Sequence, residues 1–267
     1  MPAQAEKPPT THGATTHFGF REVAEADKAP MVRQVFDSVA PRYDLMNDLM
    51  SAGVHRLWKS TLIAAIAPRP GELLLDVAGG TGDIATRYLD ALDRAGDPAA
   101  AAQDARAIVC DINGEMLDVG RDRTIDGGRL KGVAWVAGDA EHLPVASSSI
   151  DVYTIAFGLR NVTHIDAALA EARRVLRPGG RFFCLEFSRV VLPLLDKLYD
   201  LYSFQVLPRL GQWVTGDRDA YQYLVESIRK FPSQDQLARQ VSDAGLERVR
   251  VRNLSGGVAA IHSAWRL

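Results

Sequence analysis

The chain has 267 residues, of which 47% are hydrophobic and 24% charged, an ordinary balance for a globular protein with one sizeable core. Thirty-one basic residues against thirty-three acidic ones give a net charge of −2, so nucleic acid is not expected as a partner. The two cysteines, Cys110 and Cys184, exclude a disulfide-rich secreted scaffold, and no apolar stretch is long enough to cross a bilayer. We therefore expect a cytoplasmic protein with buried thiols.

The N-terminal region divides into a tail and a helical cap. Residues 1–29 are expected to form a flexible tail, because the start of the chain has too few apolar side chains to pack. A single domain is expected over residues 30–267. Apolar residues recur at helical spacing from Pro30 to Pro41 and again from about Val54 to Ala67. These two helices precede the first strand and predict a cap over residues 30–70.

Strand and helix patterns alternate after the cap. Short apolar runs separated by helical patterns over residues 71–190 predict a doubly wound α/β core, with helices on both faces of the sheet. A capping box of Ser233 and Gln236 predicts a further helix in residues 233–267. The expected strands are 73–77, 107–110, 133–136, 150–156, 181–187, 247–252 and 258–266.

Residues 191–232 are expected to form a helical region beside the core. Between 194 and 207 the polar positions fall at helical spacing and leave an apolar face that includes Leu198 and Tyr202. This face fits a lid over an apolar substrate, and it fits ordinary core packing equally well.

A glycine-rich turn follows the first strand of the core. The run from Asp76 to Gly82 (DVAGGTG) ends an apolar strand and opens a helix. Gly80, Gly82 and Ala85 satisfy the dinucleotide pattern G-x-G-x-x-A. Alone, this pattern also fits a structural turn in any α/β protein.

Two polar segments follow the next two strands. Asp111 ends the second strand, where a carboxylate can accept hydrogen bonds from both ribose hydroxyls of a nucleoside. The segment 138–140 (GDA) follows the third strand. Each segment alone also fits a structural role, as a helix cap or a surface turn. Because the carboxyl ends of parallel strands meet in one crevice, the three segments together predict a nucleoside site.

These motifs resemble the nucleoside-binding motifs of class I S-adenosylmethionine-dependent methyltransferases, and 174–181 (RVLRPGGR) resembles their post-helix motif. Three further segments are similar to signatures of the ubiquinone/menaquinone biosynthesis C-methyltransferase family: 43–47 (YDLMN) with Ser51, His55 and Trp58, 157–163 (FGLRNVT), and 185–188 (LEFS). The resemblance covers about residues 17–267. It implies a Rossmann-like fold with a seven-stranded, mostly parallel sheet and an N-terminal helical cap.

The resemblance implies S-adenosylmethionine as the cofactor, without a metal. The residues implied to bind it are Asp76, Gly79, Gly80, Thr81, Gly82, Asp111, Ile112, Asp139, Ala140 and Ala156. Ala156 departs from the pattern, because some relatives carry a serine there and a hydroxyl contact is lost.

The implied reaction is methylation of a ring carbon of a reduced polyprenyl benzoquinol (2-polyprenyl-6-methoxy-1,4-benzoquinol), of demethylmenaquinol, or of both. Such a ring carbon becomes nucleophilic when the hydroxyl loses a proton, so the site needs a proton acceptor and a group that stabilises the oxyanion. Arg160 and Asn161 are expected to hold the quinol oxygen, with Tyr43 and His55 closing over the acceptor from the cap. A structural ion pair is the alternative for Arg160, and ordinary packing is the alternative for His55.

A polyprenyl acceptor implies contact with the inner face of a membrane, and association with other quinone-biosynthesis enzymes and the oligomeric state stay open. Two other functions also stay open. A nicotinamide-dependent oxidoreductase shares the glycine turn but leaves the signatures at 43–47 and 174–181 unexplained. A catalytically weak assembly subunit of a quinone-synthesis complex would carry the same motifs.

Overall fold

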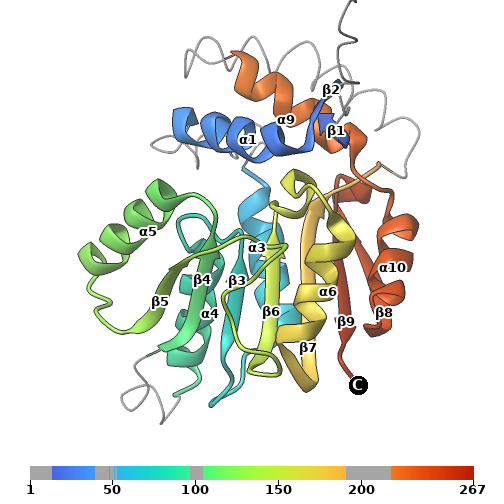
Figure 1. The fold of residues 1–267 in the computed structure, drawn as a ribbon. Helices are drawn as coiled ribbons and strands as arrows, with labels where there is room; N and C mark the ends of the chain where they lie inside the picture. Colours follow the sequence, from blue (N-terminus) through green and yellow to red (C-terminus); the bar gives the residue numbers. More distant parts are fainter. Residues whose placement is uncertain (1–13, 40–47, 49–50, 52, 97–104, 191–217) are drawn as a thin grey trace, which may run out of the picture.

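The computed structural model describes residues 14–39, 48, 51, 53–96, 105–190 and 218–267. At its centre lies a seven-stranded sheet of order β5-β4-β3-β6-β7-β9-β8 (Figure 1). Neighbouring strands from β5 to β7 pair in parallel, whereas β9 pairs antiparallel with both β7 and β8. The strands are β3 (Leu74–Val77), β4 (Ala105–Asp111), β5 (Gly132–Ala137), β6 (Ile150–Ala156), β7 (Leu176–Phe187), β8 (Glu247–Leu254) and β9 (Ala259–Trp265). The expected mostly parallel, seven-stranded sheet is confirmed.

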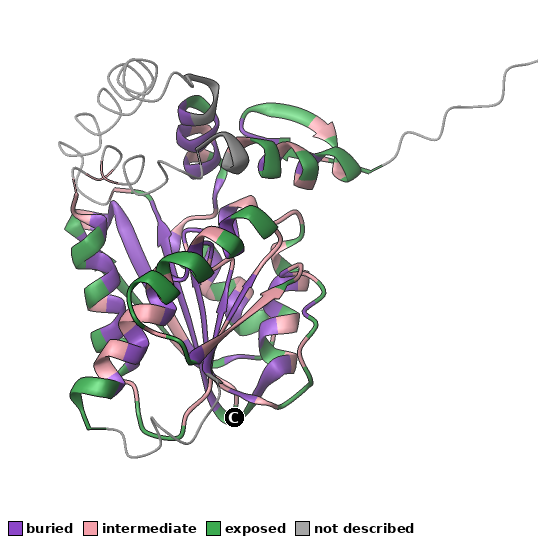
Figure 2. Cartoon of the chain, turned by 90° about the vertical axis from the view of Figure 1, so that its left-hand side faces the viewer, coloured by how far each residue is buried: buried purple, intermediate pink, exposed green. Residues whose placement is uncertain are grey.

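Helices cover both faces of this sheet, so strands such as β3 and β6 are largely buried, whereas the edge strand β8 is mostly exposed (Figure 2). Successive strand residues point to opposite faces: Leu74 packs in one apolar cluster with α3 (His55–Ile66) and α4 (Asp83–Arg94). Leu75 packs in a second cluster with α6 (Ile165–Val175) and α10 (Gln234–Asp243). Helix α5 (Gly114–Asp126) packs on β4 and β5. The doubly wound architecture is confirmed, as is the burial of both free cysteines.

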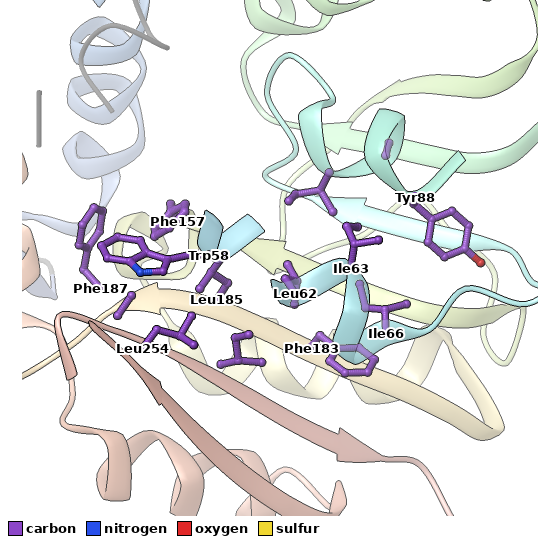
Figure 3. Close-up of a cluster of buried hydrophobic side chains, with 14 of the residues drawn as sticks. Trp58, Leu62, Ile63, Ile66, Tyr88, Phe157, Phe183, Leu185, Phe187 and Leu254 are labelled. Carbon is purple, nitrogen blue, oxygen red and sulfur yellow. The ribbon is translucent and has the colours of Figure 1, made fainter. Parts of the chain in front are cut away.

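Helix α3 anchors the cap region on the sheet (Figure 3). Its buried side chains are spaced as one helical stripe, namely His55, Trp58, Lys59, Leu62, Ile63 and Ile66. The Trp58 ring meets Phe187 of β7 edge-on at 5.9 Å between centroids, and its indole N–H donates to the Ser255 hydroxyl. One charged residue, Lys59, therefore lies on an otherwise core-forming stripe.

The N-terminal region is more ordered than its sequence predicted. β1 (Thr15–Phe18) and β2 (Arg21–Ala24) form an antiparallel hairpin, and helix α1 (Glu25–Val39) begins five residues before the expected start at Pro30. The flexible tail is therefore wrong for residues 14–29. The error follows from Pro30, since proline is favoured at helix starts but here lies inside the helix.

The hairpin is held by helix α9 (Arg218–Lys230), which lies beside α1 over one end of the sheet (Figure 1). The Phe18 ring stacks on Tyr223 at 4.1 Å between centroids, and the Phe20 N–H donates to Glu226. These contacts are not visible in the sequence, because they join residues more than 200 positions apart.

Other expectations have mixed outcomes. The capping box of Ser233 and Gln236 is confirmed. β7 begins at Leu176 rather than at 181, because Leu176 pairs with Ile150 of β6 and the Arg266 N–H donates to the Gly180 carbonyl at 2.9 Å. The helix expected at 194–207 lies outside the described residues. Within the part that is described, no helix is long and apolar enough to span a membrane.

Candidate functional site

A cavity of about 350 Å³ lies at the carboxyl ends of β3, β4, β5 and β6. Helix α1 forms its roof, held by Lys28, whose ammonium donates to the Val162 carbonyl at 2.8 Å, and by Arg33, which donates to the Ile112 carbonyl at 3.2 Å. Of the residues expected in the site, this cavity is lined by Gly80, Asp111, Ile112, Asp139, Ala140 and Asn161.

A smaller cavity of about 30 Å³ adjoins the first one, and Ala78, Gly80 and Phe157 line both. It brings together four further residues expected to bind the cofactor: Asp76, Gly79, Thr81 and Ala156. Gly82 lines neither cavity, and its positive φ of 74° and tight contact with Trp135 give it a structural role. All but one of the expected cofactor residues thus share a continuous site.

The backbone at the junction of the two cavities is constrained. Ala78 and Phe157 have positive φ values of 50° and 58°, which non-glycine residues rarely adopt. A side chain at Gly79 would place its Cβ 2.8 Å from Val109 and 2.9 Å from a carboxylate oxygen of Asp76. Such strained conformations cluster at ligand sites, and here they flank the glycine turn.

Asp111 is held in place by backbone donors. One carboxylate oxygen accepts the Gly80 N–H and the other the Asn113 N–H, both at 2.8 Å. Burial raises the pKa of Asp111, although these N–H groups oppose the shift. Each carboxylate oxygen has a second lone pair, so Asp111 can accept two hydroxyl groups from a ligand in the larger cavity.

Asp76 is completely buried and only half satisfied. Its Oδ1 accepts the Thr154 hydroxyl at 2.8 Å, whereas Oδ2 has no hydrogen-bond partner among the described residues. Burial raises the pKa of Asp76 to about 7, and the Thr154 hydroxyl, the charge of Lys59 and the Ala85 backbone offset only part of this shift. A buried oxygen left without a partner beside a cavity indicates a place for a ligand donor.

Arg160 does not face either cavity. Its side chain is 2% exposed and forms an ion pair with Glu186 at 3.2 Å, and its guanidinium also donates to the Phe157 carbonyl. Glu186 is 1% exposed and accepts the N–H groups of Arg160 and Phe187 as well. The structure thus shows the ion pair that was the alternative for Arg160, and the expectation that Arg160 holds the acceptor's oxygen stays a prediction.

Asn161, the next residue, lines the larger cavity. Its Oδ1 accepts the Tyr223 hydroxyl at 3.0 Å, which leaves the amide N–H groups to donate elsewhere. Tyr223 is 4% exposed, and burial raises its pKa, so the phenol stays protonated. Sequence reasoning missed Tyr223, because nothing in the pattern of α9 separates it from core tyrosines such as Tyr221.

Of the two site residues expected in the cap, His55 and Tyr43, the structure describes only His55. His55 is 3% exposed and lies 2.9 Å from Asp48 through Nε2. Burial lowers the pKa of His55 to about 4, with Lys59 adding to the effect, and His55 does not line the larger cavity. Its expected role over the acceptor stays a prediction. Tyr43 lies outside the described residues, and no group of three or more potential metal ligands occurs among those that are described.

Known proteins match nearly the whole chain. The model of the ubiE/COQ5 methyltransferase family matches residues 20–266. The chain belongs to this family. A Paracoccus denitrificans protein named ubiquinone/menaquinone biosynthesis C-methyltransferase UbiE is 58% identical over 94% of this chain and 97% of its own. A zebrafish protein named 2-methoxy-6-polyprenyl-1,4-benzoquinol methylase, mitochondrial, is 53% identical over 97% of this chain and 86% of its own.

Solved structures agree on the fold. A Thermotoga maritima protein described as a SAM-dependent methyltransferase superposes with a TM-score of 0.58, at 18% identity over 87% of this chain and all of its own. The [4+2]-cyclase SpnF superposes with a TM-score of 0.60, at 17% identity over 88% of this chain and 94% of its own. Since a cyclase shares the architecture, the fold alone does not fix the reaction. The family match makes this chain a methyltransferase and removes the oxidoreductase alternative.

Proposed function

We propose that the chain transfers a methyl group from S-adenosylmethionine to a ring carbon of a reduced polyprenyl quinone. The observation that carries this proposal is 58% identity over nearly the whole chain to a relative named as a C-methyltransferase of ubiquinone and menaquinone biosynthesis. The two joined cavities support it, since they hold nearly all the residues expected to bind the cofactor.

The residues at both cavities fit the cofactor's two ends. Asp111 offers free lone pairs to the ribose hydroxyls, and Asp139 and Ala140 line the part of the larger cavity next to it. Asp76 offers its unpartnered Oδ2 to a cationic donor at the glycine turn. When bound, S-adenosylmethionine supplies a methyl group on a positively charged sulfur. The protein's task is to hold an acceptor carbon in line with that bond.

Asn161 is the residue that binds the acceptor's oxygen. A quinol whose hydroxyl loses a proton spreads negative charge over its oxygen and ring carbon, and a fixed N–H donor at that oxygen stabilises this charge. Asn161 lines the larger cavity, and its amide is oriented by Tyr223. Val32, Phe157 and Val162 contribute apolar walls to the same space.

The acceptor class is a 2-methoxy-6-polyprenyl-1,4-benzoquinol, a demethylmenaquinol, or both, as the names of the relatives suggest. We also propose a peripheral contact with the inner face of a membrane, because a polyprenyl tail partitions into the bilayer. Association with other enzymes of quinone synthesis would shorten the path of such an acceptor.

The test is a methyl-transfer assay with the purified full chain under reducing, oxygen-free conditions. S-adenosylmethionine with a trideuterated methyl group is incubated with short-chain forms of the two quinols, and the products are fragmented by mass spectrometry. We expect the label on a ring carbon of at least one quinol, and none with an acceptor whose hydroxyls are both methylated. Label on oxygen, or no label on either quinol, would overturn the proposal.

A further inference from the structure

A buried lysine of the cap lies at the smaller cavity. Lys59 is 5% exposed on the buried stripe of α3, and its ammonium donates to the Asp83 carboxylate at 2.8 Å. An ammonium carries three donors. The contact with Asp83 uses one of them, and Lys59 lines the smaller cavity together with Asp76 and Gly79.

Lys59 shares its carboxylate partner with a second cation. Asp83 also accepts a hydrogen bond from Arg87 at 2.7 Å, so two cations surround one carboxylate. Burial alone would raise the pKa of Asp83, but Lys59 and Arg87 outweigh it and keep the carboxylate ionised. A buried cation without a full counter-charge is unfavourable, which makes the cavity side of Lys59 a favourable place for an anion.

Asp76 lines the same cavity; its Oδ2 has no hydrogen-bond partner of good geometry among the described residues, although the Ala85 backbone lowers the pKa of this carboxyl. The lining of one cavity therefore offers both a cationic donor and a carboxyl oxygen. This pair of charges is complementary to the zwitterion of an α-amino acid, which carries one carboxylate and one ammonium on a single carbon.

We propose that Lys59 binds the α-carboxylate of the cofactor's amino-acid end, while Asp76 accepts the α-ammonium. The inference rests on the proposed function and adds the residue that recognises this end. Ala78, Gly80 and Phe157 line both cavities, so the amino-acid end of a ligand in the larger cavity would lie next to the smaller one. Helix α3 thereby contributes a side chain to the cofactor site, besides anchoring the cap.

The experiment compares two ligands that differ only at this end. S-adenosylhomocysteine carries the amino-acid group, whereas 5′-methylthioadenosine keeps the nucleoside and lacks it. In Lys59→Met, we expect calorimetry to show binding of S-adenosylhomocysteine weakened by about 10- to 100-fold, the scale of a lost hydrogen bond to a charged group. Binding of 5′-methylthioadenosine should stay within about twofold of the unmodified protein.

Arg87→Met is the matched control, because it also removes one cation from Asp83 but does not line the smaller cavity. It should leave the ratio of the two affinities unchanged. Equal weakening of both ligands in Lys59→Met, or an equal change of the ratio in Arg87→Met, would overturn the inference.

A third ligand tests the unmodified protein, so the result does not depend on whether a variant folds. Decarboxylated S-adenosylmethionine keeps the ammonium and lacks only the carboxylate. We expect it to bind about 10- to 100-fold more weakly than S-adenosylmethionine, and equal binding would contradict a role for Lys59. If none of these adenosyl ligands binds, the proposed function itself fails, which is a distinguishable result.

Discussion

Two carboxyl groups are buried in the strands of the sheet, and they differ in how completely they are paired. Glu186 on β7 is 1% exposed and has a guanidinium partner in Arg160, besides two backbone N–H donors. Asp76 on β3 is 0% exposed, yet one of its oxygens has no hydrogen-bond partner among the described residues. Burial raises the pKa of both groups.

The difference shows that burial and a raised pKa do not by themselves mark a functional carboxyl. A fully paired group such as Glu186 completes the fold, whereas an incompletely paired one beside a cavity, such as Asp76, awaits a ligand. The two carboxyls should therefore respond to substitution in opposite directions.

The largest effect is expected from breaking the paired carboxyl. Arg160→Met leaves Glu186 buried without its counter-charge, and we expect a loss of about 3–5 kcal/mol in the free energy of unfolding, measured by urea titration. The double variant Arg160→Met, Glu186→Gln should recover much of this loss, because no buried charge remains. If Arg160→Met keeps its stability and loses only methyl transfer, Arg160 acts on the acceptor and the structural assignment is wrong.

The ion pair of Arg160 and Glu186 also shows which parts of the site the sequence could predict and which it could not. The strands, the glycine turn and Asp111 were predictable, because periodicity and strand ends fix them locally. Arg160 and Asn161 are neighbours in one short helical turn, so their motif names both without telling which one faces the cavity. That choice depends on Glu186 and Tyr223, which lie 26 and 62 positions away.

Other misses have other causes. The hairpin of residues 15–24 has strands of four residues whose stability comes from α9, a contact that no local pattern records. Lys59 carried a usable signal, since a charged residue at a core-facing position of a helix is rarely unpaired. Its partners, however, lie after the first strand of the core.

The next largest effect is expected at Asp76, the incompletely paired carboxyl. Its folded pKa of about 7 lies above the usual 3.8, so between these values the folded protein holds a proton that the unfolded chain has released. Asp76 therefore lowers stability as the pH rises from about 4 to about 7. Three pKa units correspond to about 4 kcal/mol, and we expect Asp76→Asn to gain about 2–4 kcal/mol at pH 8.

Urea titrations at pH 5 and pH 8 check this expectation, and the gain should be smaller at pH 5. The same variant should bind S-adenosylhomocysteine more weakly, because it lacks the carboxylate for the α-ammonium. Glu186→Gln is the matched control and should lose stability at pH 8, since it removes the partner of Arg160. A loss of stability at pH 8 in both variants would contradict the contrast between the two carboxyls.

A smaller effect is expected at the third carboxyl, Asp111, whose oxygens accept backbone N–H groups and still face the cavity. Asp111→Ala should weaken cofactor binding by about 1–3 kcal/mol, the scale of hydrogen bonds to a charged group. Calorimetry should show the same loss for S-adenosylhomocysteine and 5′-methylthioadenosine, because both carry the ribose. Asp118→Ala, at an exposed position of α5, should change neither affinity, and unchanged binding in Asp111→Ala would remove this residue from the site.

The smallest effect is expected at Tyr223, which acts on the acceptor only through Asn161. Tyr223→Phe keeps the stacking on Phe18 and removes the hydroxyl that orients the Asn161 amide. One neutral hydrogen bond contributes about 0.5–1.5 kcal/mol, so we expect kcat to fall by about 2- to 10-fold with unchanged affinity for S-adenosylhomocysteine. Tyr88→Phe also deletes a buried hydroxyl, one without a hydrogen-bond partner among the described residues, and should leave kcat unchanged.

A double-mutant cycle separates this positioning role from a direct one. If Tyr223 acts through Asn161, adding Tyr223→Phe to Asn161→Ala lowers kcat no further, because the amide that the phenol orients is already gone. Additive losses would show that the phenol acts on the acceptor by a route of its own. If Tyr223→Phe instead lowers the melting temperature as well as kcat, Tyr223 belongs with Glu186 among the groups that stabilise the fold.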